Sequence, residues 1–273
     1  MSSSLYNPLE HACRLNNESC YLMKQKLFKD AIAKLIVALK EVKTMAIDKR
    51  EGSTPLSPQS HFVASLSQLR AARSVLAQPY EHNPTTTFWC RMEQEQVGRG
   101  GPAPVYVYEN PILITLDSSE ADLDSMNCLS FYIMFNLALS HHLRAVYDDS
   151  HNDGDKHDRK EKSLGLSRRL YELTYQLQRA CYESSNIEDN LMLTSALLNN
   201  LSVVHESLGN EQEARLCQQS LLSSLLLLVD MGGQQQQHQN HFFTNGSWQS
   251  ALDGFMGNVI HLLSTLSPVA RAA

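Results

Sequence analysis

Apolar residues recur at helical spacing along most of this 273-residue chain, and the pattern predicts a mainly α-helical protein. Between residues 8 and 48 they fall on one helical face, which Ala31 and Leu35 share. Pro8 suits a helix start, because its missing N–H has no helical partner there. We expect Gly209 to end a helix. The same spacing predicts further helices over residues 61–78, 121–147, 161–183, 187–208, 211–230 and 248–266.

The pattern changes over residues 104–117 (PVYVYENPILITLD), which are rich in Val, Ile and Tyr. This composition predicts a short β-hairpin or two extended arms that pack on the helices. Residues 49–103 hold Gly, Ser and several prolines, which predicts a partly irregular linker. Residues 232–246 contain QQQQHQNH and predict a flexible, glutamine-rich loop of low complexity.

The predicted elements divide the chain into three parts. Residues 1–48 form a first helical hairpin, and residues 49–103 form the linker. Residues 104–273 hold the extended segment, further helical hairpins and a C-terminal helix. We expect this last part to form one compact domain with residues 1–48.

An internal repeat is visible among the predicted helices. LNNESC begins at Leu15 and LNNLSV begins at Leu198. The register continues, because Asn17 and Asn200 are each followed by an alanine fourteen positions later. A third copy, FNLA, contains Asn136. The three asparagines therefore occupy equivalent positions in three helices.

This repeat resembles the tetratricopeptide repeat, a helical hairpin of about 34 residues. The small residues Ser19 and Ser202 stand where two helices of such a hairpin approach closely. The chain departs from the pattern at Glu18 and Gln218, where apolar residues are expected, and the helix-ending proline is absent. The resemblance implies a right-handed stack of α-hairpins whose concave groove accepts a peptide or helix.

The resemblance also implies which residues line that groove and bind a protein or peptide partner. Asn16 and Asn199 could hold a peptide backbone. Alternatively, the asparagines bond between turns and helices of the fold. The candidates are Asn16, Asn17, Cys20 and Lys24 in the first copy, Asn136 in the third, and Asn199, Asn200, Val203 and Glu206 in the last, with Cys13 and Ala196 beside them.

Composition narrows the classes of partner and compartment. The net charge of -6 does not suit a nucleic-acid partner, which needs a basic surface. The longest apolar stretch, residues 221–229, is too short to span a membrane. The six cysteines form no CxxC pair, and no signal peptide is recognisable. We expect a cytoplasmic protein, with the nucleus as an alternative.

Catalytic and metal-binding motifs are not recognisable in the sequence, so we expect no enzyme and no cofactor. The polar loop at residues 148–158 belongs to a stretch, residues 149–161, that partly matches a calcium loop, but His151 and Lys160 replace oxygen ligands. We interpret it as a solvated loop, with a calcium or transition-metal site as alternatives.

The function expected from the sequence is that of a protein–protein interaction scaffold. The alternative is a small-molecule binder or an enzyme, with a pocket where residues 104–117 meet the helices, near Tyr106 and Tyr108. The partner and the oligomeric state are not specified by the sequence.

Overall fold

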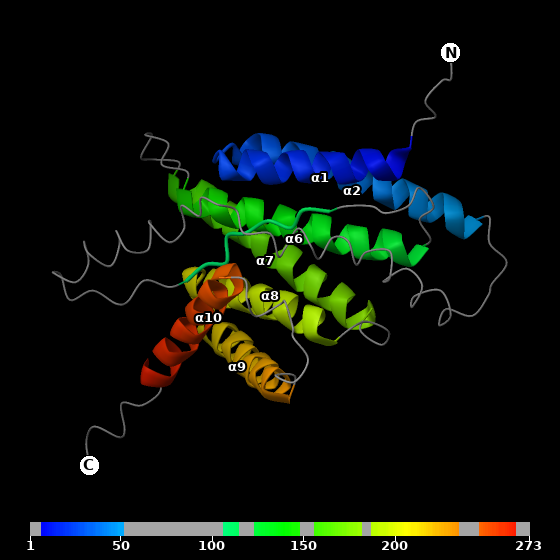
Figure 1. Cartoon of the computed structure of the whole chain (residues 1–273). Coiled ribbons are helices and arrows are strands. Elements are labelled where there is room, and N and C mark those ends of the chain that lie inside the picture. The colour runs from blue at the N-terminus through cyan, green and yellow to red at the C-terminus, as the bar shows by residue number, and fades with distance from the viewer. Residues whose placement is uncertain are drawn as a thin grey trace, which may run out of the picture. The chain divides into compact units, whose positions relative to one another are not determined.

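The computed structural model describes residues 7–51, 106–114, 123–147, 156–181, 187–234 and 246–265. These residues form seven α-helices and no strand, which confirms a mainly α-helical chain. Residues 52–105 and 235–245, with most of the predicted linker and glutamine-rich loop, lie outside the described residues. The helices are α1 (Pro8–Lys24), α2 (Phe28–Glu51), α6 (Leu123–Tyr147), α7 (Lys156–Cys181), α8 (Ile187–Ser207), α9 (Glu211–Gln234) and α10 (Gly246–Thr265) (Figure 1).

The chain divides into two compact units. Of the described residues, unit 1 contains α1, α2, residues 109–114, α6 and α7. Unit 2 contains residues 106–108, most of α8, and α9 and α10. The expected joining of residues 1–48 and 104–273 in one domain stays a prediction.

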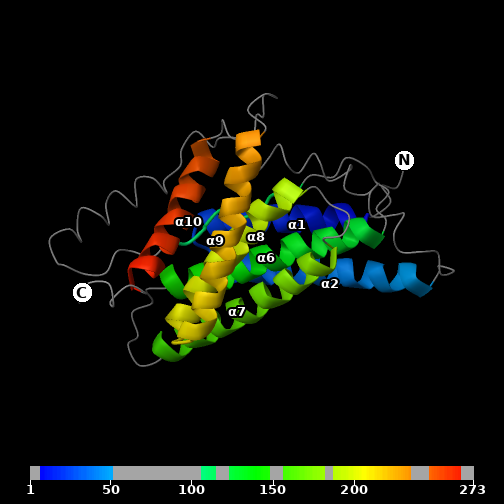
Figure 2. The same cartoon turned by 90° about the horizontal axis from the view of Figure 1, so that it is seen from below.

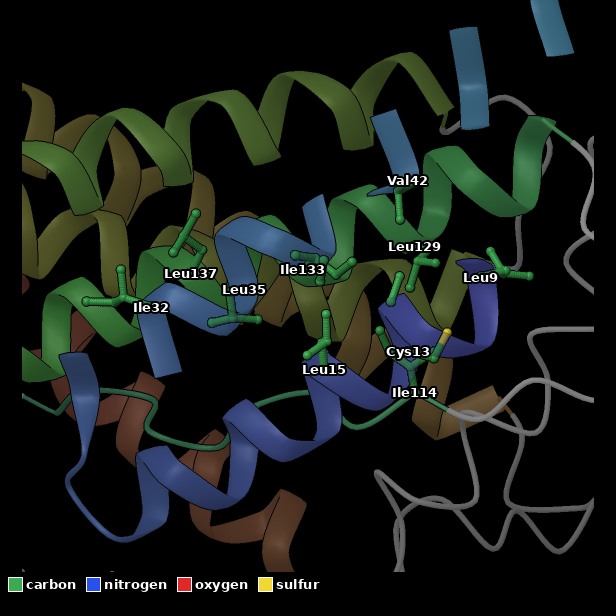
Figure 3. Close-up of a cluster of buried hydrophobic side chains, with 12 residues drawn as sticks. Leu9, Cys13, Leu15, Ile32, Leu35, Val42, Ile114, Leu129, Ile133 and Leu137 are labelled. Carbon is green, nitrogen blue, oxygen red and sulfur yellow. The ribbon is translucent and has the colours of Figure 1, made fainter. Parts of the chain in front are cut away.

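The helices of unit 1 pack in the order of the sequence, α1 on α2, α2 on α6 and α6 on α7. Figure 2 shows α6 and α7 side by side, as Figure 1 does. The core lies among α1, α2 and α6, where Leu35 and Ile133 are fully buried (Figure 3). Ile114, which belongs to no helix, is also part of this core. The apolar periodicity of the sequence therefore marks the faces that meet.

The hairpin of α1 and α2 is closed by local interactions. Asn7 caps α1, because its side-chain oxygen accepts a hydrogen bond from the N–H of Leu9 at 3.1 Å. Pro8 follows at the first helical position, as predicted. Glu18 of α1 is bonded to Lys34 of α2 at 2.6 Å, which gives this acidic departure from the repeat pattern a surface partner.

Two helix ends have the same turn. After α1, Lys26 has a φ of 60°, and the N–H of Leu27 donates to the carbonyl of Leu22 at 2.9 Å. After α8, Gly209 has a φ of 74°, and the N–H of Asn210 donates to a carbonyl in α8. Both turns are Schellman motifs, in which a left-handed residue ends the helix. The prediction that Gly209 ends a helix is confirmed.

The start of α7 differs from the prediction. The helix begins at Lys156, five residues before the expected residue 161, so the prediction of a loop over residues 156–160 is wrong. Asp158 and Lys162 form an ion pair one turn apart at 2.6 Å, which supports the helix at this end. The other half of the calcium-like loop, residues 148–155, lies outside the described residues.

The contact between α6 and α7 contains a buried histidine. His142 is 1% exposed and lies edge-on to Tyr171, with 6.1 Å between the ring centroids. Its Nδ1 is buried without a hydrogen-bond partner. Because burial penalises the charged imidazolium, the pKa of His142 falls from 6.5 to about 4.

Replacing one glycine at a time by alanine should have opposite effects at two positions. Gly209→Ala forces a side chain into the left-handed region and should lower the free energy of unfolding by about 1 kcal/mol. Gly165→Ala in α7 meets no atom within 4 Å of the added carbon, and should raise it by up to about 1 kcal/mol. Urea unfolding followed by circular dichroism measures both, and effects of equal sign would contradict this account of the turn.

The protein should lose stability between pH 6.5 and pH 4. The unfolded chain binds a proton at His142 below about pH 6.5, whereas the folded chain binds it only near pH 4. The free energy of unfolding should therefore fall, by about 2 kcal/mol at pH 5 for this residue. Unfolding of His142→Leu should depend less steeply on pH, whereas His157→Leu, at a side chain 94% exposed, should keep the wild-type slope.

Candidate functional site

Residues 106–114 form neither helix nor strand, and their backbone is bound by side chains of the helices. We call this stretch the resident segment. Figure 1 shows its second half passing between α1 and α6. Val107, Tyr108, Ile112 and Ile114 are each at most 8% exposed. A buried backbone without secondary structure must find other hydrogen-bond partners, and asparagine side chains provide them.

In unit 1, two asparagines each hold both backbone groups of one residue. Asn17 accepts from the N–H of Ile114 at 2.8 Å and donates to its carbonyl at 2.7 Å. Asn136 accepts from the N–H of Ile112 at 2.8 Å and donates to its carbonyl at 2.7 Å. A carboxamide has an acceptor oxygen and a donor nitrogen side by side in one plane, which matches the N–H and carbonyl of an extended residue.

Two further side chains of α1 complete this arrangement. The Nδ2 of Asn16 donates to the carbonyl of Ile112 at 2.9 Å, and its Oδ1 accepts from Asn136 at the same distance. The thiol of Cys20 lies 3.4 Å from the carbonyl oxygen of Ile112. Burial raises the pKa of Cys20 to about 12, so the thiol keeps its proton at neutral pH and can donate it.

Unit 2 contains the same arrangement. Asn200 accepts from the N–H of Tyr108 at 2.8 Å and donates to its carbonyl at 2.9 Å. Asn258 holds Tyr106 in the same way, with both bonds at 2.8 Å. Asn199 donates to the carbonyl of Tyr106 at 3.0 Å and accepts from Asn258 at 2.7 Å.

The two units therefore bind two tripeptides by the same contacts. Unit 2 holds the first and third residues of Tyr-Val-Tyr, and unit 1 holds the first and third residues of Ile-Leu-Ile. In an extended chain, residues two apart direct their backbone groups to the same side. The asparagines contact backbone atoms, so these bonds do not depend on the side chains of the bound peptide.

Most of the residues predicted for a partner site contact the resident segment. Asn16, Asn17, Cys20, Asn136, Asn199 and Asn200 bond to its backbone, as the preceding distances show. The remaining three differ. Val203 is buried, Glu206 is exposed, and the ammonium of Lys24 lies 6.0 Å from the ring centroid of Tyr21. Binding of a partner protein by these nine residues stays a prediction.

Asn258 was not predicted from the sequence. The sequence predicted only a C-terminal helix here, and Asn258 stands in no recognisable copy of the repeat. One weak signal exists, because Asn258 precedes Val259 on a buried helix face as Asn136 precedes Leu137. A polar residue followed by a branched apolar residue is too common to identify a site.

The place proposed for a small-molecule pocket is filled by aromatic contacts within unit 2. The ring of Tyr106 lies edge-on to Phe255, with 5.6 Å between centroids, and that of Tyr108 lies 6.0 Å from Phe255. Tyr108 is 5% exposed, and burial raises the pKa of its hydroxyl group. The Tyr108 hydroxyl therefore keeps its proton at neutral pH, and both rings take part in packing. The alternative of a pocket stays a prediction.

One polar side chain of the resident segment has a side-chain partner in unit 1. The hydroxyl of Tyr147 donates to Glu109 Oε1 at 2.6 Å. The ammonium of Lys26 lies 4.6 Å from the ring centroid of Tyr147, and Phe28 stacks on the same ring. Burial raises the pKa of Glu109, and the bond from Tyr147 and the charge of Lys26 oppose this rise.

Comparisons of the chain with protein-family models, with curated proteins and with solved structures found no match. The tetratricopeptide resemblance therefore stays a prediction. None of the helices in the described ranges is long and apolar enough to cross a membrane.

Removing one asparagine of unit 2 should destabilise the protein strongly. Asn200→Ala leaves the N–H and carbonyl of the buried Tyr108 without these partners, which should lower the free energy of unfolding by about 2–5 kcal/mol. The control, Asn110→Ala, changes a half-buried asparagine of the resident segment and should cost less than about 0.5 kcal/mol. Urea unfolding compares them, and equal losses would show that the bonds to Tyr108 contribute little.

Proposed function

We propose that this protein is a helical-repeat scaffold that binds extended peptide segments by their backbone, through the asparagines of α1 and α6 in unit 1 and through those of α8 and α10 in unit 2. One observation carries the proposal. Four asparagines, Asn17, Asn136, Asn200 and Asn258, each pair with the N–H and carbonyl of one residue of an extended segment. Side chains that contact a segment only through its backbone groups suit the recognition of peptides.

The repeat supports a tetratricopeptide-like stack as the architecture. Consecutive helices of unit 1 pack as antiparallel hairpins would, α1 with α2 and α6 with α7. The number of residues from Asn17 to the turn at Lys26 equals the number from Asn200 to the turn at Gly209. The two hairpins that these turns close therefore have the same register. In such a stack the first helices of the hairpins line the concave face, where the asparagines would lie.

The chemistry of the site favours binding over catalysis. Its contacting groups are carboxamides, which neither ionise nor act as nucleophiles, and a thiol whose pKa is raised to about 12. The resident segment occupies the site in this structure, and a partner peptide would take its place. The structure of the bound resident segment therefore describes how such a partner would bind.

A synthetic peptide with the sequence of residues 104–117 should bind to a full-length chain whose resident segment is weakened. Ile112→Ser provides this receptor, because it removes a side chain that is 2% exposed. Methylating one peptide nitrogen at a time removes one N–H and keeps every side chain. Methylation at Tyr108, Ile112 or Ile114 should weaken binding about tenfold or more, because each N–H donates to an asparagine. Fluorescence anisotropy of the labelled peptide measures the affinity.

Methylation at Leu113 is the matched control. Its neighbours on both sides donate to asparagines, and its own side chain is half-buried. The peptide methylated at Leu113 should therefore bind more tightly than the peptides methylated at Ile112 or Ile114. A second receptor, Tyr106→Ser, changes a less buried position and serves if Ile112→Ser lowers the helicity measured by circular dichroism. Absence of binding to both folded receptors would contradict the proposed function.

A further inference from the structure

Backbone contacts hold an extended peptide but do not choose among sequences. Any residue except proline offers the same N–H and carbonyl to an asparagine. Selection must therefore come from the side chains at the positions that the asparagines fix. The resident segment shows what surrounds each of these positions in the units to which it belongs.

In unit 2, the side chains of Tyr106 and Tyr108 contact an aromatic ring, and that of Tyr106 also faces the backbone of a glycine. Gly254 of α10 faces the ring of Tyr106, and a Cβ at Gly254 would overlap that ring. Phe255 contacts both Tyr106 and Tyr108. Flat rings fit over a glycine and edge-on to a phenylalanine, whereas a branched aliphatic side chain fills neither contact well.

Unit 1 surrounds the position of Ile114 with aliphatic contacts and buries the side chain of Ile112. Ile114 is 1% exposed and lies in the cluster that includes Leu9, Leu15 and Ile133 (Figure 3). Ile112 is 2% exposed. Closely packed aliphatic surroundings accept isoleucine, leucine or valine at little cost, but a polar or larger side chain only with strain.

In the sequence between these two pairs of positions, the contacts in unit 1 favour an acidic residue at the position of Glu109. Tyr147 donates to the carboxylate of Glu109, and Lys26 contributes a favourable charge. Phe28 stacks on Tyr147 and limits the positions open to its ring. A lysine at the position of Glu109 would meet Lys26 with the same charge, and a glutamine would keep the hydrogen bond but lose the attraction.

We propose that unit 2 selects the pattern aromatic-x-aromatic and that unit 1 selects the pattern acidic-x-x-aliphatic-x-aliphatic, each presented as an extended segment of another protein. This inference rests on the proposed function and names its class of ligand. The two patterns are those of residues 106–114, Tyr-Val-Tyr-Glu-Asn-Pro-Ile-Leu-Ile. The resident segment then acts as an internal competitor of the same patterns.

The source of the ligand follows from this competition. A tethered segment has an effective concentration in the range of about millimolar. A second copy of the chain brings an identical segment, which cannot displace the tethered one at lower concentrations. A segment of another protein can displace it when its side chains fit these positions better. A segment of another protein therefore binds only if its affinity for these positions exceeds that of the resident segment.

Variants of the peptide of residues 104–117 test the pattern on the Ile112→Ser and Tyr106→Ser receptors. Tyr108→Ala and Ile112→Ala in the peptide should weaken binding about 10- to 100-fold, because each removes a buried side chain. Glu109→Lys should weaken it about tenfold, and Glu109→Gln by less. Asn110→Ala is the control and should bind as the unchanged peptide does. Equal binding by all of these peptides would overturn the pattern and leave the proposed function intact.

A matched pair of receptors tests the aromatic position alone. Both substitutions are made in the Ile112→Ser receptor, whose resident segment is weakened. Gly254→Ala places a methyl group where the ring of Tyr106 lies, whereas Gly257→Ala adds one in open space on the same helix. The peptide with Tyr106→Ala should bind Gly254→Ala more tightly than the unchanged peptide does. On Gly257→Ala the order should be reversed. The same order on both receptors would show that this position does not select aromatic residues.

Sedimentation of the wild-type chain at micromolar concentrations distinguishes the source of the ligand. We expect a monomer, because the tethered segment outcompetes that of a second copy. A dimer that is lost in the Ile112→Ser variant would overturn the assignment to another protein and identify a second copy of the chain as the partner.

Discussion

The pairing of a carboxamide with both backbone groups of one residue is the interaction on which the rest of this structure depends. Residues 106–114 bury apolar side chains among helices, and the described part of the chain contains no strand that could satisfy their backbone. Burying an N–H and a carbonyl without partners costs more than a typical hydrogen bond contributes. Asparagines on otherwise apolar helix faces remove this cost at alternate residues. Polar residues such as Asn136, which is fully buried, are therefore required by the fold.

The same constraint explains why the arrangement is duplicated. Asn16 bridges Asn17 and Asn136 in unit 1, as Asn199 bridges Asn200 and Asn258 in unit 2. Each bridging amide donates to a carbonyl of the bound segment and orients its neighbours, so the three side chains of a unit hold each other in position. In each unit, two helices that carry these asparagines hold one tripeptide of the resident segment together.

Much of the helical structure could be predicted from the sequence, because apolar periodicity and a left-handed glycine are local signals. Gly209 and the equivalence of Asn17 and Asn200 were found in this way. The start of α7 was missed, because its first residues are charged and lack an apolar face. The partner of the asparagines was also missed. Asn200 bonds to a residue 92 positions away, and no periodicity records a contact over such a separation.

Ile114 connects the stability of the fold to the occupation of the site. This residue belongs to the core of α1, α2 and α6, and its backbone is also held by Asn17. Removing the resident segment would therefore expose apolar surface of the core as well as unpaired amides. An empty site is unfavourable for both reasons, so the proposed exchange would require a ligand that supplies an aliphatic side chain and an extended backbone together. The proposed selectivity and the stability of unit 1 would thus depend on the same atoms.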